Sequence, residues 1–169
     1  MSNYNCKEIL QVFGQNIRFA REKRNYTIKD LALKAKYNRI DLSKIEYGEK
    51  DIQLSTAIKL AKAIDVPLPD LFSRNYVNLY EQIPEQDRPD FKEDDFLLVF
   101  STNVRTILRS LFRNEVSFYS EIGMDPATVS RILNQRIQDP RISTLEAITK
   151  SISKSLPELL SRTSERGNY

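Results

Sequence analysis

The stretch TIKDLALKAKYNRIDLSKIEYG, residues 27–48, decides the fold of this 169-residue chain. Thr27 is a candidate helix N-cap, and Asp30 follows it at the spacing of the acidic partner in a capping box. Asn38 is a candidate N-cap for a second short helix, which Gly48 would end. Two short helices joined by a three-residue turn predict a helix-turn-helix.

The apolar residues of this stretch predict how its two helices pack. Leu31 and Ala32 would lie on one side of the crossing, and Leu42 and Ile45 on the other. Ala32 has to be small because two backbones approach closely there. The second helix would then project its first residues outward. An α-helix is narrow enough to enter the major groove of DNA.

The rest of the chain also has a helical pattern. Apolar residues recur at helical spacing over residues 9–20 and again from Ser55 to Ile64. Pro67 and Pro69 interrupt the pattern, and a further helix is expected from Asp70 to about Tyr80. No segment alternates in the manner of a strand, so the prediction is an all-α fold.

The chain contains an internal repeat. A shift of 87 residues, with one residue inserted later, superimposes the first part of the sequence on the last. Matches this widely spread predict a tandem repeat of a unit of roughly 60–65 residues, a size at which one small core is just viable. The matched pairs include Asn16 with Asn103, Ser55-Thr56 with Ser143-Thr144, and Leu68-Pro-Asp-Leu71 with Leu156-Pro-Glu-Leu159.

Charge divides the chain in the same way. Residues 1–76 carry 14 Lys+Arg and 9 Asp+Glu, a net charge of +5, and residues 96–169 carry 10 and 7, a net charge of +3. Residues 77–95 carry 2 and 7, a net charge of −5, with two prolines and little apolar content. We therefore predict two domains, residues 9–76 and 96–162, joined by an acidic linker over residues 77–95.

Missing residue types exclude several classes of chemistry. The chain has no histidine, which excludes Ser-His-Asp triads, histidine metal sites and imidazole bases. Cys6 is the single cysteine, so the sequence offers neither an intrachain disulfide nor a cysteine zinc site. None of the 4 glycines forms a phosphate-binding loop. We expect no enzyme activity, no metal and no cofactor.

The hydropathy pattern predicts a protein outside the membrane. No apolar run approaches the roughly 20 residues that span a bilayer. The first residues lack the basic-then-apolar pattern of a secretory signal, so a cytoplasmic protein is expected.

The first domain resembles the Cro/phage-repressor (XRE) family of helix-turn-helix DNA-binding proteins. Residues 16–32, NIRFAREKRNYTIKDLA, resemble the first two helices of that family, and residues 38–48, NRIDLSKIEYG, its recognition helix and following glycine. Residues 54–72 resemble its last two helices. Lys36 stands at a turn position where the family usually has glycine, so an unusual backbone angle is expected there. Ile28 stands where many members have a phosphate-contacting glutamine.

The second domain resembles the family less closely. Residues 123–133, GMDPATVSRIL, match its turn and recognition helix, with Asp125 as N-cap and Pro126 at the first helical position. Tyr119 stands where the family has a small alanine, so either the helices separate slightly or the motif geometry is altered. The resemblance implies two five-helix repressor-like helix-turn-helix domains.

The repeat also allows one internal comparison. The family pairs an arginine in the first helix with a glutamate at the end of the recognition helix, and the first domain has Arg21 and Glu46 at these positions. The second domain has Leu108 and Leu133 there. A joint exchange of both partners is expected for a buried pair, because losing one partner strands a charge. We predict an Arg21–Glu46 ion pair and a Leu108–Leu133 contact in its place.

The resemblance assigns the DNA-binding residues of the first domain. Arginine and lysine can donate to guanine, and isoleucine can pack on a thymine methyl group. A lysine just after the recognition helix is expected to meet phosphate. The residues assigned are Arg39, Ile40 and Lys44 to bases, Ser43 and Tyr47 to the DNA backbone, and Lys50 to phosphate.

The equivalent surface of the second domain has two arginines and several small polar residues, so it could bind DNA too. A decayed repeat used for dimerisation is the alternative. The residues of this surface are Ala127, Thr128, Arg131, Asn134 and Arg136.

These patterns predict a sequence-specific DNA-binding transcriptional regulator, more specifically a repressor. Its recognition helices would lie near residues 38–47 and 125–134, and its partners would be double-stranded DNA and, as in the family, a second copy of the chain. The alternative is a protein-interaction or antitoxin-like module with DNA binding confined to the first domain.

Overall fold

The computed structural model describes residues 6–111 and 114–162 of the chain. Within these ranges all regular structure is helical, apart from one isolated β-bridge, so the predicted all-α class is confirmed. The helices are α1 (Lys7–Lys23), α2 (Ile28–Lys34), α3 (Arg39–Glu46), α4 (Leu54–Ile64), α5 (Leu68–Leu71), α6 (Tyr76–Gln82), the 3-10 helix η1 (Glu85–Asp87), α7 (Phe96–Ser110), α8 (Glu115–Glu121), α9 (Pro126–Leu133), α10 (Ile142–Ser151) and α11 (Leu156–Leu160). We call α1–α5 the first half and α7–α11 the second half.

Helix α2 begins at the predicted capping box. The Thr27 hydroxyl accepts a hydrogen bond from the backbone N–H of Asp30 at 3.1 Å, and the Thr27 N–H donates to the Asp30 carboxylate at 2.8 Å. These bonds satisfy backbone donors that have no partner inside the helix. The Thr27 hydroxyl also donates to the Asp30 carboxylate at 2.6 Å, and this bond, together with that from the Thr27 N–H, lowers the pKa of Asp30.

Helix α3 begins at the predicted N-cap. The Asn38 side-chain oxygen accepts hydrogen bonds from the N–H groups of Ile40 at 2.8 Å and Asp41 at 3.1 Å. The turn before the helix has Lys36 at φ 49°, so the unusual backbone angle expected there is confirmed. Gly48 follows the helix at φ 69°, and a Cβ there would lie 2.7 Å from Cγ of Gln11, so both conformation and space require glycine.

The core of the first half brings α1 and α3 into close contact. Phe13 stacks on Phe72 with ring centroids 4.8 Å apart, and both rings are buried. A Cβ at Gly14 would overlap the carbonyl oxygen of Ile45, so α1 can approach α3 only because this position lacks a side chain. Ala32 is buried at the α2 crossing, as its small size predicts.

The continuous helix expected from Asp70 to about Tyr80 is wrong. Helix α5 ends at Leu71, and α6 begins only at Tyr76. The buried side-chain amide of Asn16 donates to the carbonyl oxygens of Leu71 at 3.1 Å and Ser73 at 2.8 Å. These tertiary hydrogen bonds keep the chain out of the helical path between α5 and α6. The predicted linker, residues 77–95, therefore starts inside a helix and contains η1.

The second half contains an equivalent interaction. The Asn103 side-chain amide on α7 donates to the carbonyl oxygens of Leu159 and Ser161, each at 2.9 Å. Asp125 caps α9, with Pro126 at the first helical position as predicted. Residues 112 and 113 of the predicted second domain lie outside the described ranges.

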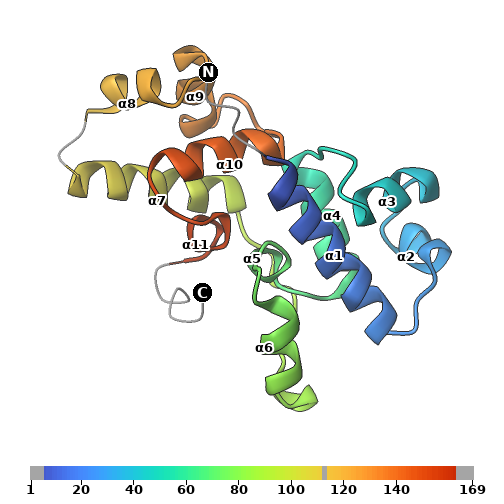
Figure 1. Cartoon of the computed structure of the whole chain (residues 1–169). Coiled ribbons are helices and arrows are strands. Elements are labelled where there is room, and N and C mark those ends of the chain that lie inside the picture. Colours follow the sequence, from blue (N-terminus) through green and yellow to red (C-terminus); the bar gives the residue numbers. More distant parts are fainter. Residues whose placement is uncertain (1–5, 112–113, 163–169) are drawn as a thin grey trace.

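The two halves share one buried apolar cluster. Helix α5 packs against α11, and α1 packs against α10. Figure 1 shows α1–α4 on the right and α7–α9 on the left, with α10, α5 and α11 between them. Among the helices described, none is long and apolar enough to cross a membrane.

Candidate nucleic-acid interface

Helix α3 exposes one edge that bears cationic, apolar and aromatic side chains. Its other face is buried through Leu42, Ile45 and Glu46. Burial of this face turns the remaining positions outward, as the helical repeat requires. Arg39 and Lys44 are exposed, Ile40 is 64% exposed, Tyr47 is 63% exposed, and Ser43 is half-buried.

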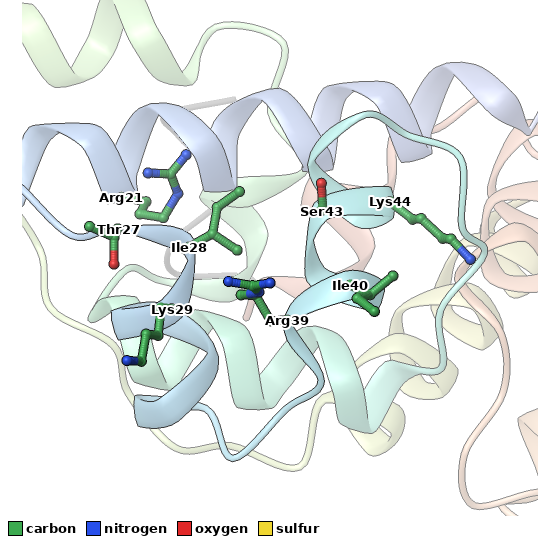
Figure 2. Close-up of a pocket in the computed structure, with 8 residues that line it drawn as sticks. All are labelled: Arg21, Thr27, Ile28, Lys29, Arg39, Ile40, Ser43 and Lys44. Atoms are coloured by element: carbon green, nitrogen blue, oxygen red, sulfur yellow. The ribbon is translucent and has the colours of Figure 1, made fainter.

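The exposed edge of α3 borders an open groove between α2 and α3. Figure 2 shows Lys29 from α2 and Arg39, Ile40 and Lys44 from α3 around this groove, with their side-chain ends away from the helix axes. Sequence reasoning missed Lys29. Its position in the sequence could have indicated it. Lys29 lies in the first turn of α2 and directly follows Ile28, which stands where many family members have a phosphate-contacting glutamine.

A buried ion pair fixes α3 against α1. Arg21 Nε donates to Glu46 Oε1 at 2.7 Å, and Arg21 Nη2 donates to Glu46 Oε2 at 2.9 Å. Arg21 Nη1 also donates to the carbonyl oxygen of Tyr26 at 2.8 Å. Both charged side chains are largely buried, at 10% and 3% exposure. The hydrogen bonds to Glu46 raise the pKa of Arg21, so the guanidinium group stays charged.

Residues 17–71 match the model of a protein family described as Helix-turn-helix (HTH_3). The chain contains an HTH_3 helix-turn-helix domain. Such a domain implies DNA binding of the kind that transcriptional regulators use, and its family is typically non-enzymatic. The match runs from α1 to α5 and covers none of the second half. No curated protein and no solved structure matches the chain.

The loop after α3 of the HTH_3 domain holds Lys50 in an ion pair. Lys50 Nζ lies 2.8 Å from Asp41 Oδ2, and it also lies 5.9 Å from the centroid of the Tyr37 ring. The hydrogen bond between Lys50 and Asp41 lowers the pKa of Asp41 and raises the pKa of Lys50. A phosphate at Lys50 would therefore compete with Asp41 for the ammonium group.

Helix α9 exposes a second polar edge outside the HTH_3 match. Ala127, Arg131 and Arg136 are exposed. Two further predicted residues bond within the protein. Thr128 Oγ1 donates to Asp125 Oδ2 at 2.8 Å, and Asn134 Oδ1 accepts from Arg105 Nη2 at 2.7 Å.

The second half accommodates the larger residue at position 119. Tyr119 is buried, and its hydroxyl donates to Glu115 Oε2 at 2.6 Å, one helical turn earlier. Burial raises the pKa of Tyr119 to about 12. Leu108 and Leu133, at the positions equivalent to the ion pair of the HTH_3 domain, are both fully buried.

Proposed function

We propose that this protein is a sequence-specific transcriptional repressor that inserts α3 into the major groove of DNA. The exposed edge of α3 carries the proposal, because Arg39, Ile40 and Lys44 lie together on a helix whose opposite face is buried. A helix held this rigidly presents its side chains to base edges at little entropic cost.

Each residue of α3 and its surroundings that borders this surface has a distinct role in the proposal. Arg39 and Lys44 donate to the O6 and N7 acceptors of guanine, and Ile40 contacts a thymine methyl group. Tyr47 and Ser43 contact the DNA backbone, and Lys50 and Lys29 meet phosphates. The phosphate contacts release counterions and supply the sequence-independent part of the affinity. Occupation of a promoter would then block transcription sterically.

We further propose that α7–α11 form a second, divergent helix-turn-helix domain. Helix α8 lies 87 residues after α2, and α9 lies 87 residues after α3, each with the same length as its counterpart. Left-handed backbone angles recur at Lys36 and Gly123, 87 residues apart, and at Asp65 and Ser153, 88 residues apart after the one-residue insertion. The bonds of Asn16 and Asn103 to backbone carbonyls support the same assignment.

One recognition helix places only about three or four side chains on base edges, so specific binding needs a second one. A second copy of the chain, as in the predicted homodimer, is one source of it. The α9 edge of the same chain is the other.

A protein-interaction or antitoxin-like role is the second candidate for this protein. The bonds of Thr128 to Asp125 and of Asn134 to Arg105 favour it for the second half, because they engage side chains that a DNA contact would use. DNA binding would then be confined to the HTH_3 domain.

Selection of bound duplexes from a random pool, followed by binding measurements, tests the proposal. We expect Arg39→Ala to weaken binding to the selected duplex by about 1–3 kcal/mol while leaving binding to a scrambled duplex nearly unchanged. Lys154→Ala is the matched control, since this exposed lysine lies between α10 and α11. Equal effects of Arg39→Ala on both duplexes would refute the role of α3. Weak, salt-insensitive binding together with a co-purifying protein would favour the second candidate.

A further inference from the structure

Four polar residues join the two halves of the chain, and we call Asp51, Ser55, Asp139 and Ser143 the clasp. Ser143 donates to Asp51 through its N–H at 3.2 Å and its hydroxyl at 2.6 Å. Ser55 donates to Asp139 through its N–H at 2.8 Å and its hydroxyl at 2.7 Å. Asp139 follows Asp51 by 88 residues, and Ser143 follows Ser55 by the same number. The clasp therefore contains the same contact twice: the serine of each half donates to the aspartate of the other half.

The backbone between the clasp residues is paired in the same reciprocal way. Residues 52–54 run antiparallel to residues 140–142, and the bridge at the centre joins Gln53 to Arg141, which are also 88 residues apart. A pairing that places equivalent residues opposite each other lies on an approximate two-fold axis. The flanking hydrogen bonds run from Leu54 N to the Pro140 oxygen at 2.9 Å and from Ile142 N to the Ile52 oxygen at 2.8 Å.

Helices α5 and α11 make the third contact across this axis. They begin at Leu68 and Leu156, again 88 residues apart, and both leucines are fully buried. In a two-fold dimer of identical chains, residue i contacts residue j of the partner and residue j contacts residue i. The same reciprocity exists here inside one chain.

The reciprocity is incomplete at one place. Helix α7 begins at Phe96, which corresponds to residue 9 on the 87-residue shift. Its counterpart α1 begins two residues earlier, at Lys7. The two added residues follow Cys6, whose thiol donates to the carbonyl oxygen of Ser143 on α10 at 3.4 Å. This asymmetry reinforces the contact between the halves.

We propose that a single chain acts as its own dimer and occupies a whole operator, with α3 on one half-site and α9 on the other. This inference rests on the proposed DNA-binding function. Figure 1 shows α9 at the top and α3 at the right, both away from α5, α6 and α11. An approximate two-fold axis through the contact between the halves would also relate α3 to α9, and half-sites about 34 Å apart on one face of a duplex are related by a two-fold axis as well. The second half covers α5, part of α1 and the clasp residues of the first half, so a second copy cannot use that surface.

The two half-sites have different sequences. On the 87-residue shift, Arg39 corresponds to Pro126, and Tyr47 corresponds to Asn134. The first position of α3 therefore offers a guanidinium group, whereas the first position of α9 offers no hydrogen-bond donor. The ligand is a duplex with two unlike half-sites rather than an inverted repeat of identical ones.

Native mass spectrometry and duplex selection with the full chain test the proposal. We expect one chain on each selected duplex, and protection of two unlike motifs one helical turn apart. Insertion of five base pairs between the motifs moves them to opposite faces and should weaken binding by about 100-fold, the gain that a linked second site supplies. Two chains on an inverted repeat would overturn the proposal and leave the proposed function intact. Failure to select any duplex would overturn both.

Variants of the clasp separate the coupling of the halves from the binding of each half. Asp51→Ala with Asp139→Ala removes the clasp bonds but leaves α5 packed on α11, so it should reduce the spacing dependence and retain binding to a duplex that carries the α3 half-site alone. The control is Asp87→Ala with Asp90→Ala, which removes the same charge from the linker and should keep the spacing dependence. Arg131→Ala should weaken binding only through the second motif. A wild-type chain whose affinity ignores the second motif and the spacing would refute the proposal, even if the clasp variants fail to fold.

Discussion

Replacing Glu46 with alanine removes one partner of the buried ion pair and leaves the other in place. Arg21 loses two charge-assisted hydrogen bonds, at 2.7 and 2.9 Å, and keeps the bond to the Tyr26 carbonyl oxygen. Stranding a buried charge typically costs about 3–5 kcal/mol. Because one bond remains, we expect a loss of about 3 kcal/mol in the free energy of unfolding. For a chain of this length that corresponds to a decrease in Tm of about 6–12 °C.

The second half supplies the matched control for this substitution. Arg21→Leu with Glu46→Leu copies Leu108 and Leu133, so the double variant should recover most of the stability that Glu46→Ala loses. Arg18→Ala breaks the exposed pair with Glu22, keeps Glu22 3.8 Å from Arg21, and should leave Tm unchanged. Thermal and urea unfolding measure all three. An unchanged Tm for Glu46→Ala, or a double variant as unstable as the single one, would refute the argument from burial.

Three further predictions concern packing, the DNA-facing edge and pH. Gly14→Ala should lower the free energy of unfolding by about 2 kcal/mol or more, because its Cβ would overlap the α3 backbone; a Tm equal to wild type would disprove that close approach. Asp41→Asn frees Lys50 and removes a negative charge near the DNA, so affinity should increase and the slope of log affinity against log salt should steepen by about one. Burial raises the pKa of Glu146, so the folded chain binds this proton more tightly than the unfolded one. The free energy of unfolding of wild type, relative to that of Glu146→Gln, should therefore increase as pH falls from 7 through the raised pKa. Tm measurements on both proteins at pH 7 and pH 4 test this. A wild-type Tm that falls relative to that of the variant at pH 4 would contradict the expected direction.

The helix-turn-helix could be predicted from the sequence because its signals are local. The N-caps at Thr27 and Asn38 lie within three residues of the groups that they bond. The left-handed angle at Lys36 was expected from the resemblance, because the family usually has glycine at that turn position. The residues of α3 that face outward follow from the helical repeat once Leu42 and Ile45 are assigned to the core.

The features that the sequence did not reveal depend on distant contacts. The break between α5 and α6 comes from the side chain of Asn16, 55 residues before Leu71. The ion pair of Asp41 with Lys50 depends on the path of the loop after α3. The clasp had a visible trace, since Ser55 and Ser143 matched in the repeat, but a match says only that two positions are equivalent. It does not say that each bonds to the other half.

The acidic linker, residues 77–95, is held against the rest of the molecule by ion pairs. Glu93 pairs with Lys62 at 2.8 Å, and Asp94 pairs with Arg162 at 2.6 Å, so the segment is tied to both halves of the molecule. Figure 1 places α6, where the linker begins, at the end away from α3 and α9. In the proposed function, DNA phosphates would repel the net charge of −5 over residues 77–95 and attract the basic side chains of α3, so the molecule would approach a duplex with α3 leading. This orientation would accelerate association at low ionic strength and would weaken as salt shortens the Debye length, whereas the proposed contacts of α3 with bases depend on geometry and would set the choice of sequence.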